Sequence, residues 1–175
     1  MKRSVTVLAV AALALTAGCM GGGVVDEAAL SESATYEWNT SADASVTIEE
    51  GEYRAVLTMA NRTNVSLYGP GEFGGEAAIP ISAVQYRFEN GTVVNASAIG
   101  VTERNERTVI QVPTEGGQLG YSARVRSNAL FLPVTINGSY AVTLPEGAAV
   151  SAPIVGRVTP KGFEISSDDR TTIHW

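Results

Sequence analysis

The chain contains one cysteine, Cys19, and its surroundings suit a thiol that acts as a nucleophile. Lys2 and Arg3 form a short positive region, and the run from Val5 to Leu15 is apolar apart from Thr6. This run of about a dozen residues is shorter than the roughly 20 needed to span hydrocarbon, and its size and flanks are typical of a signal-peptide core. Small residues directly precede the thiol, so Cys19 lies where a thioether-linked lipid can be attached.

The segment Leu15-Thr16-Ala17-Gly18-Cys19 resembles a lipobox, the motif at which a prolipoprotein is lipidated on cysteine and cut before it. Thr16 replaces the commoner leucine at its position, and Leu15 lies one place earlier. We predict that residues 1–18 are a lipoprotein signal peptide and that lipid on Cys19 holds the exported protein on the outer face of the cell membrane. General secretion and twin-arginine export both remain open. Because two positive charges leave with the peptide, the net charge of −6 becomes −8.

Residues 19–35 form the predicted tether. Met20-Gly21-Gly22-Gly23 is a flexible spacer, and the segment from Asp26 to Ser33 can form one or two helical turns with acidic residues at its start. A helix this short is marginal by itself, so it must either dock on the folded part or remain loose.

The asparagines give a second indication of export. Six of the eight lie in N-x-S/T sequons, more than the content of Ser and Thr would give by chance. Sequons accept N-glycans only on chains that cross a membrane, and they imply exposed positions. The candidate N-glycosylation sites are Asn39, Asn61, Asn64, Asn90, Asn95 and Asn137. The alternative is that these residue types simply serve turns and strand surfaces.

Catalytic and metal-binding patterns are sparse. A single cysteine excludes a disulfide framework and a thiolate zinc site. The pair Asp168-Asp169 and the cluster Glu49-Glu50-Gly51-Glu52 lack the spacing of calcium loops, so both are interpreted as solvated turns. The only histidine, His174, lies too close in sequence to that aspartate pair for an ordinary triad, and no G-x-S-x-G elbow presents a serine. We therefore predict no catalytic residue, no metal site and no cofactor.

Three further segments are considered as ligand-binding sites and are interpreted as structural. The glycine-dense stretch from Tyr68 to Glu76 lacks the Lys and Ser/Thr of a phosphate-binding loop and is interpreted as a strand connection. The segment Glu103–Arg107 has the mixed charge of a solvated loop, and Tyr36 and Trp38 favour packing over ligand stacking. The balance of 12 Lys+Arg against 18 Asp+Glu argues against a nucleic-acid partner.

From about Tyr36 onward, short alternating segments recur between Gly, Pro, Asn and Asp residues, which predicts an all-β domain over residues 36–175. The expected strands are Ser45–Glu49, Tyr53–Met59, Asn64–Tyr68, Ala83–Glu89, Thr92–Ile99, Thr108–Val112, Gly120–Arg126, Ala129–Ile136, Ser139–Leu144, Ile154–Val158, Phe163–Ser166 and Thr171–Trp175. The leading architecture is an antiparallel β-sandwich, with an immunoglobulin-like arrangement as one form of it. Two smaller β modules meeting near Pro113–Gly117 are the alternative.

Two dipeptides predict hairpin tips. Asn90-Gly91 and Asn137-Gly138 each supply two residues that tolerate positive φ, as a type I′ turn requires. Pro133 cannot donate to a β ladder, so the strand expected around it should lie at a sheet edge or contain a bulge.

The basic residues comprise ten Arg and only two Lys, a Lys-poor and acidic balance seen in proteins exposed to high salt. The clusters YEWNTSAD (36–43), GEYRA (51–55), IPISAVQ (79–85) and NGTVVNASA (90–98) resemble a haloarchaeal surface lipoprotein family of unknown function. The resemblance covers most of the chain after Cys19 and implies a location and a lineage, but no reaction. It also implies a C-terminal membrane segment in some members, which leaves open whether the native chain continues past Trp175 or depends on lipid alone.

The leading functional hypothesis is a lipid-anchored cell-surface β-sandwich with a binding or structural role and no enzymatic activity. Its expected partners are the membrane, through Cys19, and a surface protein or glycan of unknown identity. The alternative is an exported hydrolase that acts on glycan or peptide through a carboxylate pair, since such pairs form only in the fold. A solute-capturing receptor is disfavoured because the chain lacks the length and the helices for two α/β lobes.

Overall fold

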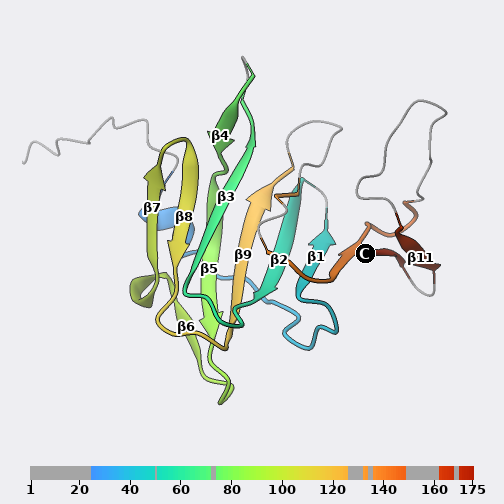
Figure 1. Cartoon of the computed structure of the whole chain (residues 1–175), viewed down its shortest axis with the longest axis horizontal. Coiled ribbons are helices and arrows are strands. Elements are labelled where there is room, and N and C mark those ends of the chain that lie inside the picture. The colour runs from blue at the N-terminus through green and yellow to red at the C-terminus, as the bar shows by residue number, and fades with distance from the viewer. Residues whose placement is uncertain are drawn as a thin grey trace, which may run out of the picture.

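The computed structural model describes residues 25–49, 51–71, 74–125, 132–133, 136–148, 162–167 and 170–175, and its strands form two packed sheets (Figure 1). The larger sheet contains, in spatial order, β11 (Glu164–Ser167), β12 (Thr171–His174), β10 (Tyr140–Thr143), β1 (Ala44–Ile48), β2 (Glu52–Thr58), β9 (Gln118–Arg124), β5 (Ile81–Arg87) and β6 (Val93–Asn95). The smaller sheet contains β4 (Glu76–Ala78), β3 (Asn64–Pro70), β8 (Arg107–Gln111) and β7 (Gly100–Arg104). Several predictions fall outside these residues, namely Cys19, Glu50, Asp168, Asp169, the strand Ile154–Val158 and most of Ala129–Ile136.

The predicted all-β sandwich is confirmed. Described neighbours in both sheets pair antiparallel, except that β1 and β10 run parallel with Ala44 opposite Tyr140. The alternative of two modules is wrong, because β9 follows the Pro113–Gly117 segment and yet lies between β2 and β5 of the same sheet. The immunoglobulin-like arrangement stays a prediction.

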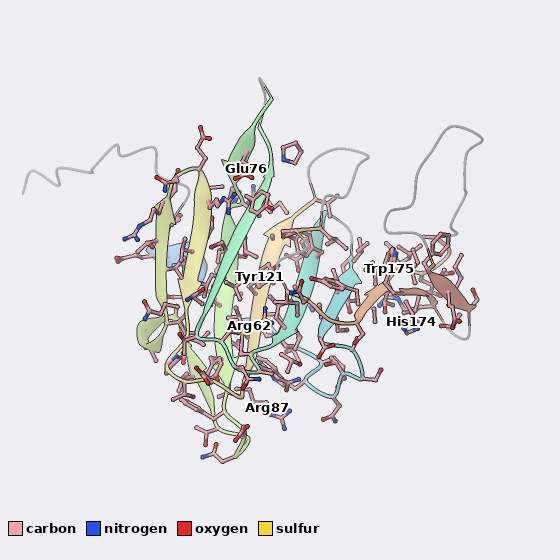
Figure 2. The ribbon with its side chains drawn as sticks, viewed as in Figure 1. Arg62, Glu76, Arg87, Tyr121, His174 and Trp175 are labelled. Atoms are coloured by element: carbon pink, nitrogen blue, oxygen red, sulfur yellow. The ribbon has the colours of Figure 1, made fainter. Side chains whose placement is uncertain are left out.

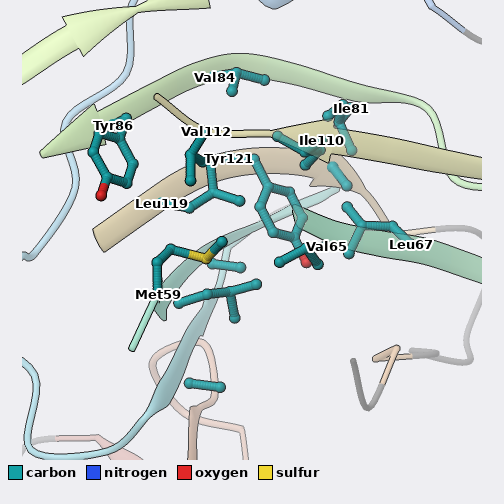
Figure 3. Packing of buried hydrophobic residues seen from close by; sticks show 14 of the residues in the cluster. Met59, Val65, Leu67, Ile81, Val84, Tyr86, Ile110, Val112, Leu119 and Tyr121 are labelled. Carbon is teal, nitrogen blue, oxygen red and sulfur yellow. The ribbon is translucent and has the colours of Figure 1, made fainter. Parts of the chain in front are cut away.

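Alternation along the strands builds one core between the sheets. In β2 the side chains of Tyr53 and Leu57 point inward and are 2% and 3% exposed. They meet residues of the smaller sheet such as Leu67 and Ile110, which are fully buried (Figure 3). Each such side chain contributes roughly 1.5–3 kcal/mol on burial, so this shared core stabilises the pairing of the two sheets.

The expected strands are found with shifts of one or two residues where the structure describes them, with two differences. The expected strand Thr92–Ile99 is divided into β6 and a 3-10 turn, Ala96–Ala98. Strands β4 and β7 were not expected, because β4 is only three residues long and four of the five residues of β7 are exposed, which removes the alternating signal.

The hairpin at Asn90-Gly91 is confirmed, but its predicted turn type is wrong. Phe88 N–H donates to Thr92 O at 2.8 Å and Gly91 N–H donates to Phe88 O at 2.9 Å, which encloses a three-residue loop. Among these residues only Gly91 has positive φ, at 85°, as in a type I turn followed by a bulge. The Asn90 side chain instead accepts a hydrogen bond from Thr92 N–H at 2.9 Å.

The prediction of a second hairpin, at Asn137-Gly138, is wrong. Both edges of β10 are occupied, by β1 and β12, so no preceding strand can pair with it. Gly138 has a φ of 152°, and its neighbour Ser139 binds Asp43 rather than closing a turn.

The expected short helix is present as α1 (Glu27–Leu30). The Asp26 carboxylate caps it by accepting a hydrogen bond from Ala28 N–H at 2.9 Å, and Leu30 is buried as part of the core. Residues from Val25 onward therefore belong to the folded domain rather than to a free tether. No helix among the described residues is both long and apolar enough to cross a lipid bilayer.

Candidate functional site

An open hollow of about 360 Å³ lies on the outer face of the smaller sheet, at the end where β3 passes into β4 and β7 turns into β8. Its lining residues are Ser66, Glu76, Arg104, Asn105, Arg107 and Val109. Most of them alternate with the core residues of the same strands, so the pattern that buries Leu67 and Thr108 turns Ser66 and Val109 outward.

Arg107 organises one wall of the hollow. Its guanidinium Nη2 lies 2.6 Å from Glu76 Oε2, and its Cζ lies 4.3 Å from the centre of the Tyr68 ring. Figure 2 labels Glu76 near the upper end of the view, beside β4. Both charged side chains remain about 40% exposed, so the ion pair contributes little to stability but fixes the direction of both groups.

Arg104 and Asn105 line the hollow next to Arg107, at the tip of the β7–β8 hairpin. Asn105 and Glu106 both have positive φ, at 51° and 59°, which makes a two-residue turn of the type I′ kind between Arg104 and Arg107. The expected solvated loop is therefore an ordered turn. Arg104 is exposed, and its planar guanidinium can form paired hydrogen bonds with a carboxylate.

The other predicted chemical groups occupy separate places. Glu49 and Glu52 flank the β1–β2 turn and both bind Arg54 Nη2, at 3.2 and 3.1 Å. His174 lies on β12, where its Nε2 is 3.4 Å from Ser166 Oγ. No group of three or more His, Cys, Asp or Glu side chains suited to a metal ion occurs among the described residues. The glycine-dense stretch connects β3 to β4, as expected.

The six sequon asparagines are all exposed. Their settings differ: Asn90 lies at the β5–β6 tip, Asn64 begins β3 and Asn95 ends β6. Asn39, Asn61 and Asn137 lie in connections between elements. Exposure is the condition that an N-glycan imposes, so all six positions stay candidates.

Residues 34–39, here termed the strap, cover the outer face of the larger sheet over β5 and β9. The Tyr36 hydroxyl donates to Ala83 O at 2.6 Å and lies 3.3 Å from Ser122 Oγ, while Gln85 Nε2 donates to Ala34 O at 2.9 Å. The rings of Tyr36 and Trp38 meet edge to face, with centroids 5.4 Å apart. The expected packing role of these two aromatic residues is confirmed.

Three buried tyrosines and one exposed aspartate have shifted titration. Burial raises the pKa of both Tyr36 and Tyr53 to about 12, and burial also raises that of Tyr121 well above 10. Hydrogen bonds from the N–H and hydroxyl of Ser139 lower the pKa of Asp43 below its ordinary 3.8. None of these four groups lines the hollow.

Sequence reasoning did not find the hollow. Ser66, Glu76 and Arg104 come from three different strands or their ends, and no local motif connects them. The one available signal was the pair of arginines flanking Asn105-Glu106, which a two-residue turn places beside each other.

One comparison with known proteins gave a match. The model of DUF5803, described as a family of unknown function, matches residues 40–175. No curated protein matches the chain, and no solved structure matches its fold.

Proposed function

The chain belongs to this family of unknown function, and we propose that it is a lipid-anchored cell-surface β-sandwich that binds a carboxylate-bearing partner in the hollow beside Arg104. The observation that carries the binding role is this hollow, because it combines an exposed guanidinium, an amide and a hydroxyl within one concave surface. The signal-peptide pattern and the lipobox support the location.

The chemistry favours a carboxylate over a phosphate or a nucleic acid. The protein carries a net charge of −6, so a highly charged polyanion is repelled at a distance. A single carboxylate needs only one free guanidinium, and Arg107 is already engaged by Glu76 whereas Arg104 has no ion pair among the described residues. Acidic surface saccharides and acidic side chains of surface proteins share this group.

The tether supports display close to the membrane. Val25 is the first described residue and packs against the core, and six residue spacings separate it from Cys19. At about 3.5 Å per spacing, the folded domain lies within about 20 Å of a lipid on Cys19.

The hydrolase alternative has no specific observation in its favour. It requires two carboxylates facing each other across a cleft. Of the carboxylates that the structure describes, Glu76 alone lines the hollow, and it is bound by Arg107.

Location and binding can be tested separately. A Cys19→Ser variant should leave the membrane fraction, with retention there refuting the lipid anchor. For binding, Arg104→Gln should weaken the affinity for a saccharide with a single uronic acid or for a peptide with a single acidic side chain by about tenfold, because a charge-assisted hydrogen bond is lost. Arg124→Gln is the matched control, since Arg124 is also exposed but lies at the end of β9, outside the hollow. Equal affinities for the two variants would refute the site, and the better probe identifies the class of partner.

A further inference from the structure

The six sequons, scattered over about a hundred residues of sequence, meet at one end of the sandwich. Strands β2 and β5 finish at this end, and β1, β3, β9 and β10 begin there (Figure 1). We term it the sequon end. The asparagines at or beside it are Asn39, Asn61, Asn64, Asn90, Asn95 and Asn137.

Hydrogen bonds across the larger sheet fix this arrangement. Ser139, two residues after Asn137, donates through N–H to Asp43 Oδ2 at 2.8 Å, which connects the segment before β10 to the segment before β1. Thr58 N–H donates to Asp43 O at 2.7 Å. Thr58 of β2 pairs with Gln118 of β9, and Gln118 in turn pairs with Arg87 of β5. The last residues of β2 and β5 therefore lie at the level where β1, β9 and β10 begin.

The smaller sheet contributes to the same end. Asn64 begins β3 opposite Gln111, and Val112 N–H donates to Thr63 O at 2.8 Å. Asn95, the last residue of β6, pairs with Gln85 of β5, which lies two residues before Arg87 at the end of that strand. Figure 2 labels Arg62 and Arg87 toward the lower end of the view and Glu76 toward the upper end. The sequons thus surround the end of both sheets rather than marking one edge.

The opposite end contains no sequon among the described residues. Asn105 lies at the tip of the β7–β8 hairpin, but Arg107 occupies the position where a sequon requires Ser or Thr. The β1–β2 and β3–β4 connections at this end contain no asparagine. The hollow opens toward this end, where Glu76, Arg104 and Asn105 line it. Ser66, which also lines it, is the third residue of the Asn64 sequon.

We propose that the sequon end is a glycan cap, in which N-glycans on both sheets close this end to partners and confine contact to the hollow end. In each transfer the asparagine Nδ2 forms a bond to C1 of a sugar held by a lipid-linked phosphate. The bond between C1 and the phosphate oxygen breaks, the phosphate leaves with the bonding pair, and one amide proton passes to a base. No electron is gained or lost. This inference rests on the proposed function, because the transfer requires export.

Site occupancy is the first test. Protein isolated from the membranes of its native host is digested and its glycopeptides are mapped by mass spectrometry. We expect glycan on Asn90 of the larger sheet and on Asn61, next to the start of β3 in the smaller sheet. An exported and processed chain that lacks glycan on either sheet overturns the cap. A chain that still begins at Met1 refutes export, and therefore the proposed function, which distinguishes the two failures.

Shielding is the second test, and it needs no substitution. An arginine-specific dicarbonyl reagent is applied to the native glycoprotein and to the same chain made in a bacterium without N-glycosylation. Labelling of Arg62 and Arg87, both partly exposed at the sequon end, should rise severalfold without glycan. Labelling of Arg104, at the hollow end, is the internal control and should not change. Equal labelling of Arg62 and Arg87 in the two preparations overturns the cap.

Discussion

Gly120 of β9 lies against the rings of Tyr36 and Trp38 in the strap, so adding one methyl group there tests how the strap is held. A Cβ built at Gly120 would lie 2.8 Å from Tyr36 Cδ2 and 2.9 Å from Trp38 Cη2, closer than carbon atoms normally approach. Tyr36 cannot simply withdraw, because the residue is only 5% exposed and its hydroxyl is bound to Ala83 O. Gly120→Ala should therefore strain the contact between the strap and β9.

The size of the effect follows from two opposing contributions. Overpacking by one methyl group in a filled site costs about 1–3 kcal/mol. The reduced flexibility of the unfolded chain returns roughly 0.4–1 kcal/mol. We expect a net loss of about 1–2 kcal/mol in the free energy of unfolding, measured by urea denaturation with the m-value unchanged.

Two comparisons make this prediction refutable. Gly100→Ala is the matched control in a strand, because its nearest neighbour, Gln111 Cβ, lies at an ordinary 3.6 Å, and it should be neutral or slightly stabilising. In a background where Tyr36 and Trp38 are both replaced by Ala, the added methyl group at Gly120 meets no ring and its cost should disappear. An equal cost in both backgrounds would show that the strap does not lie against Gly120.

Three further predictions concern titration and hydrogen bonding. Tyr36 and Tyr53 have a pKa near 10 when the chain is unfolded but about 12 when it is folded, so the free energy of unfolding should fall as the pH rises above 10. The loss should reach up to about 3 kcal/mol for each of these two groups, and Tyr121 should add to it. Tyrosinate absorbance that developed fully before the loss of structure would contradict this. Asp43→Asn should lower the denaturation midpoint at neutral pH, because Ser139 donates twice to the carboxylate, and the difference should vanish as the pH falls below 3.8, through the lowered pKa of Asp43. Tyr36→Phe removes a buried hydroxyl and leaves a carbonyl without its donor, which should cost about 1–3 kcal/mol in urea denaturation; an unchanged midpoint would argue against that bond.

The strands were predictable where burial imposes alternation. In Ile81–Arg87 the buried residues Val84 and Tyr86 alternate with the less buried Gln85 and Arg87, and the sequence pattern alone indicated this strand. Strand β7, Gly100–Arg104, was missed because an exposed edge strand imposes no such pattern. Pairing order was also beyond the sequence, since β1 and β10 are separated by about a hundred residues and interact through contacts that no local signal encodes.

Turn chemistry was predicted less well than strand position. Asn90-Gly91 marked a real hairpin, but a three-residue loop requires positive φ at Gly91 alone. A type I′ geometry occurs instead at Asn105-Glu106, where the β7–β8 register leaves only two residues between Arg104 and Arg107. The register of the flanking strands therefore determines the turn type more strongly than the residue types in the turn do. The hollow was unpredictable for the same reason, because it exists only once that register places residues of different strands together.

The strap has a mechanical consequence for a chain held at Cys19. A pull on that residue meets α1 and the strap before it meets any strand, because the strap leads into β1 in the middle of the larger sheet. The side-chain bonds that hold the strap, from Tyr36 and Gln85, are few and can be loaded one after another. The backbone ladder of β1 with β2 and β10 shares a load among many bonds at once. If the proposed lipid on Cys19 holds the chain under load, the strap yields first and extends, while the sheets and the hollow keep their form.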